Sequence, residues 1–213
     1  MRHLKISQLD SSIQSISIAP FFVAIAFTGI QCFTGRREDS DSMHHGSFGV
    51  LYAGVDPYSA FVESLLKSPD NRVVTTSALK QTGLAELRPK FPLRLVDLTP
   101  SGSLVRIGAD ARLFSADRSV AQLWSKALHD HPVCAHGILY PSRLDPVKQS
   151  VALFSDRDPK LVELNRQAWY APGPQRELLA QIAEHYRIEL IEDRFIAPKR
   201  PVATVIQPGV FDF

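Results

Sequence analysis

The sequence contains few cysteines, almost no excess charge and none of the common nucleotide-binding or hydrolase signatures. Two cysteines, Cys32 and Cys134, in 213 residues are too few for a disulfide scaffold and favour a reducing compartment such as the cytoplasm. A formal net charge of +2 argues against direct nucleic-acid binding, which leaves a strongly basic footprint. The chain has no G-x-G-x-x-G opening a helix, no Walker A sequence, no G-x-S-x-G and no H-E-x-x-H. These absences argue against the Rossmann, P-loop, α/β-hydrolase and zinc-protease classes.

The overall composition is that of a soluble globular protein. Hydrophobic residues make up 45% and charged residues 22% of the chain, and the length suits one domain with a sizeable core. Fifteen prolines indicate many turns and short elements rather than a helix bundle. Strand and helix patterns alternate without the regular order of a doubly wound sheet, so we predict a compact, single α+β domain with short mixed strands and flanking helices.

The N-terminal segment 1–33 ends in an apolar run, "ISIAPFFVAIAFTGIQCF", over residues 16–33. Its length and the preceding Arg2 and Lys5 are compatible with a signal peptide or membrane anchor. Polar residues before the run, Pro20 within it and the lack of a clean A-x-A-like cleavage site favour a buried strand or helix instead. We therefore expect no membrane association.

Periodicity predicts the regular elements in the rest of the chain. Alternating patterns predict strands in segments 48–52, 93–98, 136–143, 150–154 and 188–193. Apolar stripes predict helices in segments 57–67, 115–131 and 173–188, the second of them capped by Ser115. The helix in 173–188 is expected to bury Leu178, Leu179, Ile182 and Tyr186. Residues 197–213 are punctuated by prolines and are interpreted as a surface tail.

A histidine-rich patch, "HDHPVCAHG", contains residue types that bind zinc: His129, His131, Cys134 and His136. Tetrahedral sites usually take paired ligands from separate places, and only the His44–His45 pair offers a second group. The first two histidines lie at a predicted helix end, where a positive side chain complements the helix dipole. We therefore expect no metal site here.

One glutamate stands out in "GVLYAGVDPYSAFVES". Asp56 is a good N-cap and Pro57 suits the first helical position. Glu63 follows on that helix with apolar residues three positions away on either side. Considered singly, Glu63 is a solvated helix residue, Tyr52 a core strand residue, and Ser142 a turn residue that follows proline.

Taken together and in this order, "GVLYAGVDPYSAFVE" and "GILYPSRLDPVKQSVALF" resemble the RES domain family, which is named for an arginine, a glutamate and a serine. The resemblance runs from about Gly35 to Asp193, within a RES-like domain assigned to residues 34–196. It implies an α+β fold similar to the ADP-ribosyltransferases of the diphtheria-toxin type.

The resemblance also implies an activity and its site. Members consume NAD, so NAD is the expected substrate, and breaking the nicotinamide–ribose bond needs no metal. The family glutamate and serine correspond to Glu63 and Ser142 as catalytic residues, and the family tyrosine corresponds to Tyr52. Arg36 is taken as the family arginine, with Arg37 as the alternative. Glu63 would stabilise positive charge on the ribose, Tyr52 would stack on nicotinamide, and Arg36 would bind the pyrophosphate.

Several points stay open at this level. The acceptor of ADP-ribose is phosphate, water or a protein side chain, and a degenerate member with only a binding role is a further alternative. Many bacterial family members are toxins neutralised by a helix-turn-helix antitoxin. We expect such a partner, if present, to cover the cleft near residues 38–47. The sequence also leaves a homo-oligomer open.

Overall fold

The computed structural model describes residues 15–18, 23–28, 48–66, 70, 72–99, 103–115 and 118–193. The predicted arginines Arg36 and Arg37, the segment 38–47 and the tail 197–213 lie outside this part of the chain.

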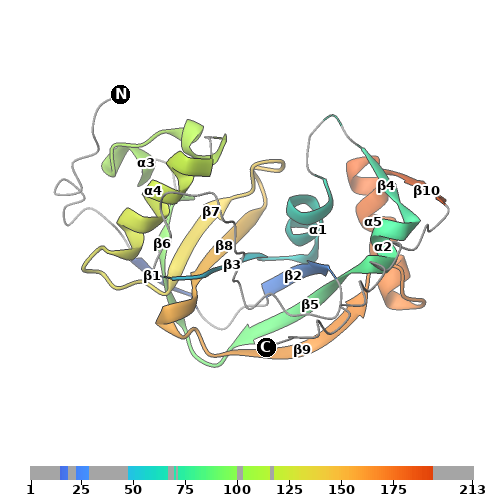
Figure 1. Ribbon diagram of the computed structural model, residues 1–213, viewed down its shortest axis with the longest axis horizontal. Helices are drawn as coiled ribbons and strands as arrows, with labels where there is room; N and C mark the ends of the chain where they lie inside the picture. The colour runs from blue at the N-terminus through green and yellow to red at the C-terminus, as the bar shows by residue number, and fades with distance from the viewer. Residues whose placement is uncertain are drawn as a thin grey trace, which may run out of the picture.

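A mixed eight-stranded sheet forms the centre of the molecule (Figure 1). Its strand order is β1-β6-β7-β8-β3-β2-β5-β9, and only the β6–β7 pair is parallel. The strands are β1 (Ser15–Ile18), β2 (Val23–Thr28), β3 (Val50–Gly54), β5 (Thr82–Pro89), β6 (Leu93–Asp97), β7 (Gly137–Pro141), β8 (Gln149–Phe154) and β9 (Leu161–Ala168). A separate parallel pair joins β4 (Val73–Thr75) and β10 (Glu189–Ile191).

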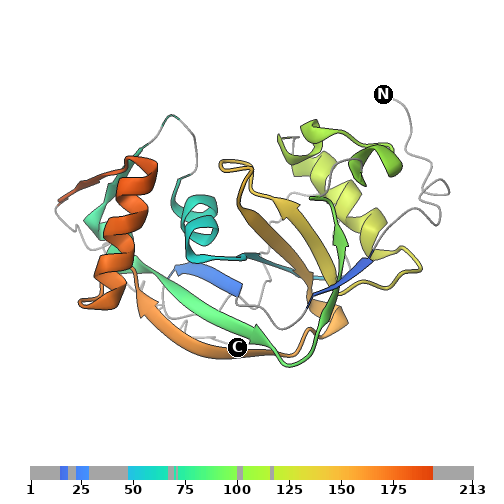
Figure 2. The same ribbon diagram turned by 180° about the vertical axis from the view of Figure 1, so that it is seen from behind.

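The helices gather at two ends of this sheet. Both views of the ribbon place α3 and α4 at one end of the molecule, α5 and α2 at the other, and α1 between them (Figures 1 and 2). The helices are α1 (Pro57–Leu65), α2 (Thr76–Gln81), α3 (Ser103–Arg106), α4 (Arg118–His129) and α5 (Pro174–Tyr186), with 3₁₀ turns η2 (Ala111–Ser115) and η3 (Ser155–Arg157).

The register of the central strands separates two faces of the sheet. Ala152 of β8 pairs with Tyr52 of β3 on one side and with Ile138 of β7 on the other. Paired residues point to the same face of a sheet. Trp124 and Leu128 of α4 pack on this face in one cluster with Ile138 and Ala152.

The opposite face of the sheet carries its own apolar cluster. Leu139, Val151 and Leu153 alternate with the residues of the first face, and they pack with Leu93 and Leu95 of β6. Burying apolar side chains on both faces gives the sheet most of its stabilisation, at roughly 25 cal/mol per Å² of apolar surface.

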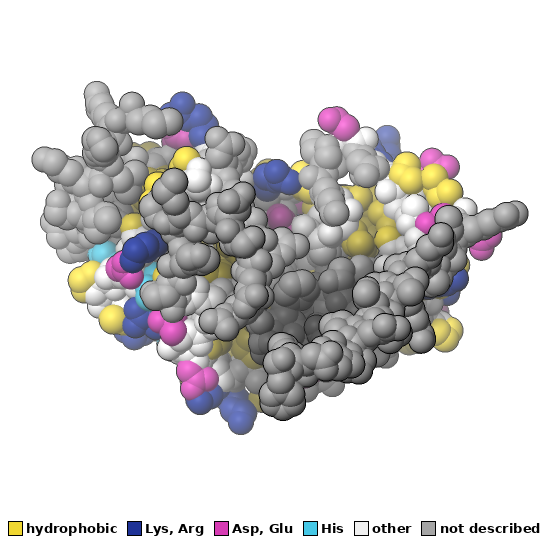
Figure 3. All heavy atoms as spheres, viewed as in Figure 1, with side chains coloured by type: hydrophobic (Ala, Val, Ile, Leu, Met, Phe, Trp, Pro, Cys, Tyr) yellow, Lys and Arg dark blue, Asp and Glu magenta, His cyan; other side chains and the backbone are white. Residues whose placement is uncertain are grey.

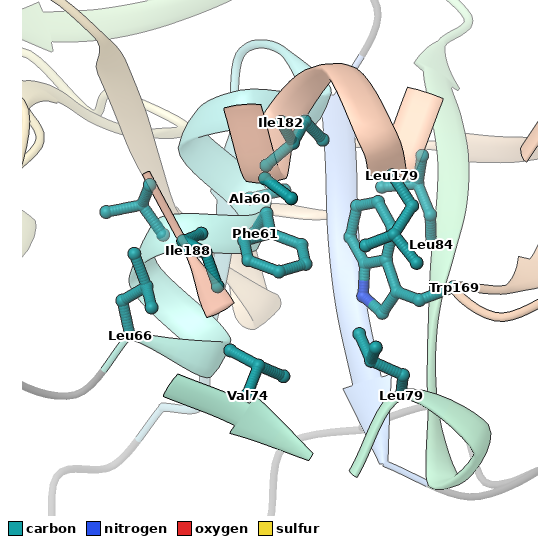
Figure 4. Packing of buried hydrophobic residues seen from close by; sticks show 12 residues of the cluster. Ala60, Phe61, Leu66, Val74, Leu79, Leu84, Trp169, Leu179, Ile182 and Ile188 are labelled. Carbon is teal, nitrogen blue, oxygen red and sulfur yellow. The ribbon is translucent and has the colours of Figure 1, made fainter. Parts of the chain in front are cut away.

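Helix α1 is fixed by a third cluster that it shares with α5 (Figure 4). Phe61 and Trp169 are fully buried, and their rings meet edge to face with centroids 5.0 Å apart. Leu179 and Ile182 of α5 pack on the same cluster. The apolar side of α1 thus points into this core, which leaves its other side for the site.

Gly54, the last residue of β3, lets α1 approach the sheet closely. A Cβ atom at this position would lie 2.3 Å from the backbone nitrogen of Ala60 and 2.3 Å from Ser59 Oγ. Only glycine fits such an approach of helix backbone to strand. The start of α1 is therefore set by the absence of a side chain at residue 54.

The α+β class is confirmed, as are the predicted strands that became β3, β6, β7, β8 and β10. Residues 15–18 and 23–28 form strands of the main sheet, in line with the preferred interpretation of the apolar segment. Strands β4, β5 and β9 were not predicted.

Two details of the predicted helices differ from the structure. Ser115 is not the residue that precedes α4: it ends η2, and α4 begins at Arg118. The backbone carbonyl of Asp110 accepts the Leu113 amide, and its side chain accepts the Arg112 amide. These bonds start a short 3₁₀ turn that already includes Ser115.

On α5, the buried residues are Gln175, Leu179, Ile182 and Ala183, while Leu178 and Tyr186 are only partly buried. The buried stripe is therefore rotated slightly from the predicted one.

Candidate active site

A cavity of about 260 Å³ lies on the sheet face that carries Tyr52, Ala152 and Ile138. Figure 3 shows the surface hollowed between the part of the molecule that carries α3 and α4 and the part that carries α1 and α5. The lining residues come from the central strands, α1, η2, α4 and the start of the β7–β8 loop (residues 142–148). They are mostly apolar or aromatic, as in small-molecule sites.

Glu63 lies at the edge of this cavity and is held by two hydrogen bonds from the β7–β8 loop. Its Oε1 accepts the Ser142 hydroxyl at 2.5 Å and the Arg143 backbone amide at 3.0 Å. Ser142 is buried, whereas Glu63 is exposed. Its exposure leaves the carboxylate accessible. The two hydrogen bonds fix its position, because hydrogen bonds to a carboxylate are about twice as strong as those between neutral groups.

Tyr52 lies on β3, the strand that precedes α1, and lines the same cavity. Its side chain is 62% exposed, so it is not the core residue that a strand position alone would suggest. The tight connection between β3 and α1 places Tyr52 and Glu63 at one cavity, as predicted from their spacing. The structure thus brings together three of the four predicted site residues: Tyr52, Glu63 and Ser142.

Tyr140 is a lining residue that the sequence reasoning missed. Burial raises the pKa of its phenol, and the negative charge of Glu63 raises it further. The hydroxyl is therefore protonated at neutral pH and can donate a hydrogen bond. A signal was present in the sequence, because Tyr140 lies near the end of the strand predicted over 136–143 and only two residues before Ser142.

The far wall of the cavity is built by α4 and η2. Ala121, Trp124, Ser125 and Leu128 of α4 line it; they occur at the i, i+3, i+4 and i+7 spacing of one helix face. The ring of Phe114 lies parallel to Tyr140 with centroids 6.5 Å apart. This wall offers flat, apolar surface and one hydroxyl, that of Ser125.

The arginine predicted to bind phosphate is not located by these contacts. Arg36 and Arg37 lie outside the described residues. Arg143 is exposed, follows Ser142 directly and lines the cavity, so one arginine of the described residues lines the same cavity as Glu63. The assignment of Arg36 remains a prediction.

The histidine-rich patch has a packing role in the part of the chain that the structure describes. The ring of His129 is stacked on Phe48, with centroids 3.7 Å apart. Its two ring nitrogens lie 2.9 Å from carboxylate oxygens of Asp130 and Asp156. Among residues 48–193, gaps excepted, no group of three or more His, Cys, Asp or Glu side chains is arranged to hold a metal ion.

None of the helices in the described part of the chain is both long enough and apolar enough to cross a membrane.

The mixed sheet and the cavity with one anchored carboxylate define an α+β domain with a candidate small-molecule site. The protein belongs to the RES domain family, whose model matches residues 16–180. This match confirms the resemblance. It begins within β1 and includes β2.

Two known proteins are similar to this chain, one in sequence and one in fold. A protein of Sinorhizobium fredii named "Probable toxin y4kH" is 33% identical over 117 residues, which cover 53% of this chain and 86% of that protein. The crystal structure of the M. tuberculosis MbcT–MbcA toxin–antitoxin complex contains a chain with the same fold. It superposes with a TM-score of 0.59 at 16% identity, over 82% of this chain and 96% of that one.

Proposed function

We propose that the protein degrades NAD by breaking the bond between nicotinamide and ribose, and that it is a cytoplasmic toxin of a bacterial toxin–antitoxin pair. The observation that carries the proposal is the fixed carboxylate of Glu63 at the edge of an aromatic cavity that also contains Tyr52. The family membership and the toxin name of the S. fredii relative support it.

The chemistry requires negative charge near the ribose. As the C1″–N bond breaks, nicotinamide leaves as a neutral molecule with the electron pair, and the ribose develops oxocarbenium character. A carboxylate fixed beforehand stabilises this charge without reorganising during the reaction. Glu63 takes this role, and Ser142 keeps its carboxylate in place while presenting a hydroxyl to the ribose or acceptor.

The dimensions of the cavity suit part of the dinucleotide. At about 260 Å³ it is slightly smaller than the roughly 300–1,000 Å³ of pockets for drug-sized ligands. The nicotinamide ring fits inside against Tyr52 and the α4 wall, because aromatic rings favour offset stacking on other rings. The pyrophosphate and adenosine then extend outside, where Arg36 and Arg143 are the candidates for phosphate contacts.

The acceptor is phosphate or water in the function we favour. With water, one proton is released for each ADP-ribose formed; with phosphate, the product is ADP-ribose 1″-phosphate. Transfer of ADP-ribose to a protein side chain is the second candidate, and the exposed carboxylate at the cavity edge favours it because a macromolecular acceptor can reach that position.

The partner we propose is a helix-turn-helix antitoxin that covers the cavity, in line with the toxin–antitoxin complex formed by the M. tuberculosis relative. Segment 38–47 precedes β3 and carries three acidic residues and two histidines, so we propose it as part of this contact. A homo-oligomer is also compatible with the proposal.

Purified protein incubated with NAD is expected to release nicotinamide in proportion to NAD lost. Chromatography of the products with and without phosphate identifies the acceptor: ADP-ribose 1″-phosphate indicates phosphorolysis and ADP-ribose indicates hydrolysis. Heat-denatured protein is the blank. NAD that remains intact under both conditions, and with cell extract added as a source of protein acceptor, contradicts the enzymatic proposal.

Arg36→Lys is expected to raise the KM for NAD about 10-fold, with a smaller change in kcat. An ammonium group cannot reproduce the bidentate contact of a guanidinium with pyrophosphate oxygens, and a charge-assisted pair of this kind contributes about 1.5–3 kcal/mol. Arg37→Lys serves as the matched control in the same segment. An effect confined to Arg37→Lys would assign the role to Arg37, and no effect of either would move it to Arg143.

A further inference from the structure

We infer that Lys148 is a positioning residue that, with Asp56, clamps the β7–β8 loop onto α1 and so holds Ser142 and Glu63 in register. The inference rests on the proposed function for its catalytic consequence, but the clamp itself consists of contacts in the fold. Neither residue lines the cavity, so both act through other side chains.

The loop is attached to α1 at two points. Glu63 holds its first residues through Ser142 and Arg143. Asp56 holds its last residue, because Lys148 Nζ lies 2.8 Å from Asp56 Oδ2. Asp56 and Glu63 are seven residues apart, which is about two helical turns, so both face the same side of α1. The loop thus runs along one side of the helix and is tied at each end.

Lys148 connects these two points through its backbone. Its carbonyl accepts the amide of Ser142 at 2.8 Å, and its own amide donates to the carbonyl of Asp145 at 2.9 Å. Its ammonium group also lies 4.7 Å from the centre of the Tyr58 ring, a cation–π contact on the first turn of α1. The side chain of Lys148 therefore fixes the backbone that fixes Ser142.

The clamp is also braced from outside by α5. The Tyr186 hydroxyl donates to Asp145 Oδ2 at 2.8 Å, and the rings of Tyr58 and His185 meet edge to face at 5.4 Å. Burial raises the pKa of the Asp56 carboxyl. The hydrogen bonds donated by Lys148 and by the Ser59 amide, together with the positive charge of Lys148, outweigh burial and hold this pKa below its usual value. The carboxylate is thus ionised at neutral pH, as the ion pair requires.

Loss of the Lys148 side chain removes the ion pair at the Asp56 end of the loop. The hydrogen bonds to Glu63 and the packing of Leu144 on the cluster that contains α1 remain. The Ser142 hydroxyl and the Arg143 amide then fix the carboxylate less well, while the stacking surfaces of Tyr52 and α4 are untouched. Misplacing a catalytic group lowers the rate of the chemical step more than it lowers ground-state binding. We therefore expect an effect on kcat with little effect on KM.

The test compares Lys148→Met and Asp56→Asn with the wild type. Asparagine caps a helix about as well as aspartate, so Asp56→Asn removes the ion pair and keeps the N-cap. Both variants are expected to lower kcat for NAD about 10-fold and to change KM less than 2-fold, by analogy with other positioning losses. The control is Lys160→Met, which removes an exposed ion pair with Asp158 far from α1 in sequence and is expected to leave both constants unchanged.

A double-mutant cycle separates positioning from general destabilisation. If Lys148 acts through Ser142, adding Lys148→Met to Ser142→Ala lowers kcat no further, because the group to be positioned is already gone. If the two effects multiply, or if Lys148→Met changes KM and kcat equally, the positioning role is overturned.

Amide hydrogen exchange tests the clamp without reference to activity. Lys148→Met is expected to speed exchange of the Ser142 and Arg143 amides at least about 10-fold relative to the α5 amides, since these protons are bonded within the clamp. Unchanged exchange overturns the clamp. Faster exchange in a protein that never releases nicotinamide upholds the clamp and rejects the proposed function, so the two failures are distinguishable.

Discussion

Replacing Glu63 with glutamine is expected to reduce the rate of NAD consumption by a factor of at least about 100, because groups that stabilise transition-state charge contribute about 10²–10³ in kcat. Glutamine has the same shape, and its amide oxygen can still accept the Ser142 hydroxyl and the Arg143 amide, which now bind Glu63 Oε1. The substitution therefore removes the negative charge with little change in geometry. Because Glu63 is exposed, the melting temperature should stay within a few degrees of the wild type.

The measurement is the initial rate of nicotinamide release, together with thermal unfolding of the same samples. Glu184→Gln, an exposed glutamate on α5, is the matched control and should retain full activity. In bacteria, strong expression of the wild type alone should slow growth and lower cellular NAD, and Glu63→Gln should relieve both. Wild-type turnover by Glu63→Gln would remove this residue from the mechanism.

Gly54→Ala is expected to have the largest effect on stability, and it should also disturb the site. The added Cβ would lie 2.3 Å from the backbone nitrogen of Ala60, and backbone cannot rotate away as a side chain can. Helix α1 must therefore move. Overpacking of this kind costs about 1–3 kcal/mol, which lowers the melting temperature by about 2–12 °C for a protein of this size.

The same movement displaces Glu63, about one turn beyond Ala60 on α1, so activity per folded molecule should fall as well. Two measurements distinguish these effects. Thermal unfolding, monitored by circular dichroism, reports stability, and turnover well below the melting temperature reports activity. Gly108→Ala is the control: its φ of +74° makes a side chain unfavourable, but nothing lies within 4 Å. It should lose some stability and keep its activity. An unperturbed Gly54→Ala would contradict the close packing of α1 on β3.

Local signals predicted the parts of the site that depend on neighbours in sequence. Asp56 and Pro57 marked the start of α1, and the structure adds a capping box in which Asp56 and Ser59 bond each other's backbone amides. Tyr52 and Glu63 could be assigned to one cleft because a short connection joins their elements. Their pairing with Ser142 came from the family resemblance alone, because Glu63 and Ser142 are 79 residues apart.

The missed elements lack a local signal for physical reasons. Strand β5 is buried on nearly every residue, so it shows none of the alternation that marks a half-exposed strand. Strand β9 is the reverse case: nearly all of its residues are exposed, so no apolar face distinguishes it from a loop. In the sequence, the helix that forms the α4 wall is recognisable only as amphipathic. Its periodicity identifies the buried face of the helix but not the strands on which that face packs.

The order of strands in the sheet has a consequence for how the protein is made. Strand β3, which carries Tyr52, pairs with β2 and with β8, and Tyr52 faces Ala152 one hundred residues later in the chain. Contacts so distant in sequence form slowly, because a long loop must close before they are gained. During synthesis on the ribosome, at about 5–20 residues per second, α1 emerges well before Ser142 and β8. The nascent chain therefore holds Glu63 without Ser142, and Tyr52 without its β8 partner, until residues 142–154 have been synthesised, so the candidate site is assembled only after that point.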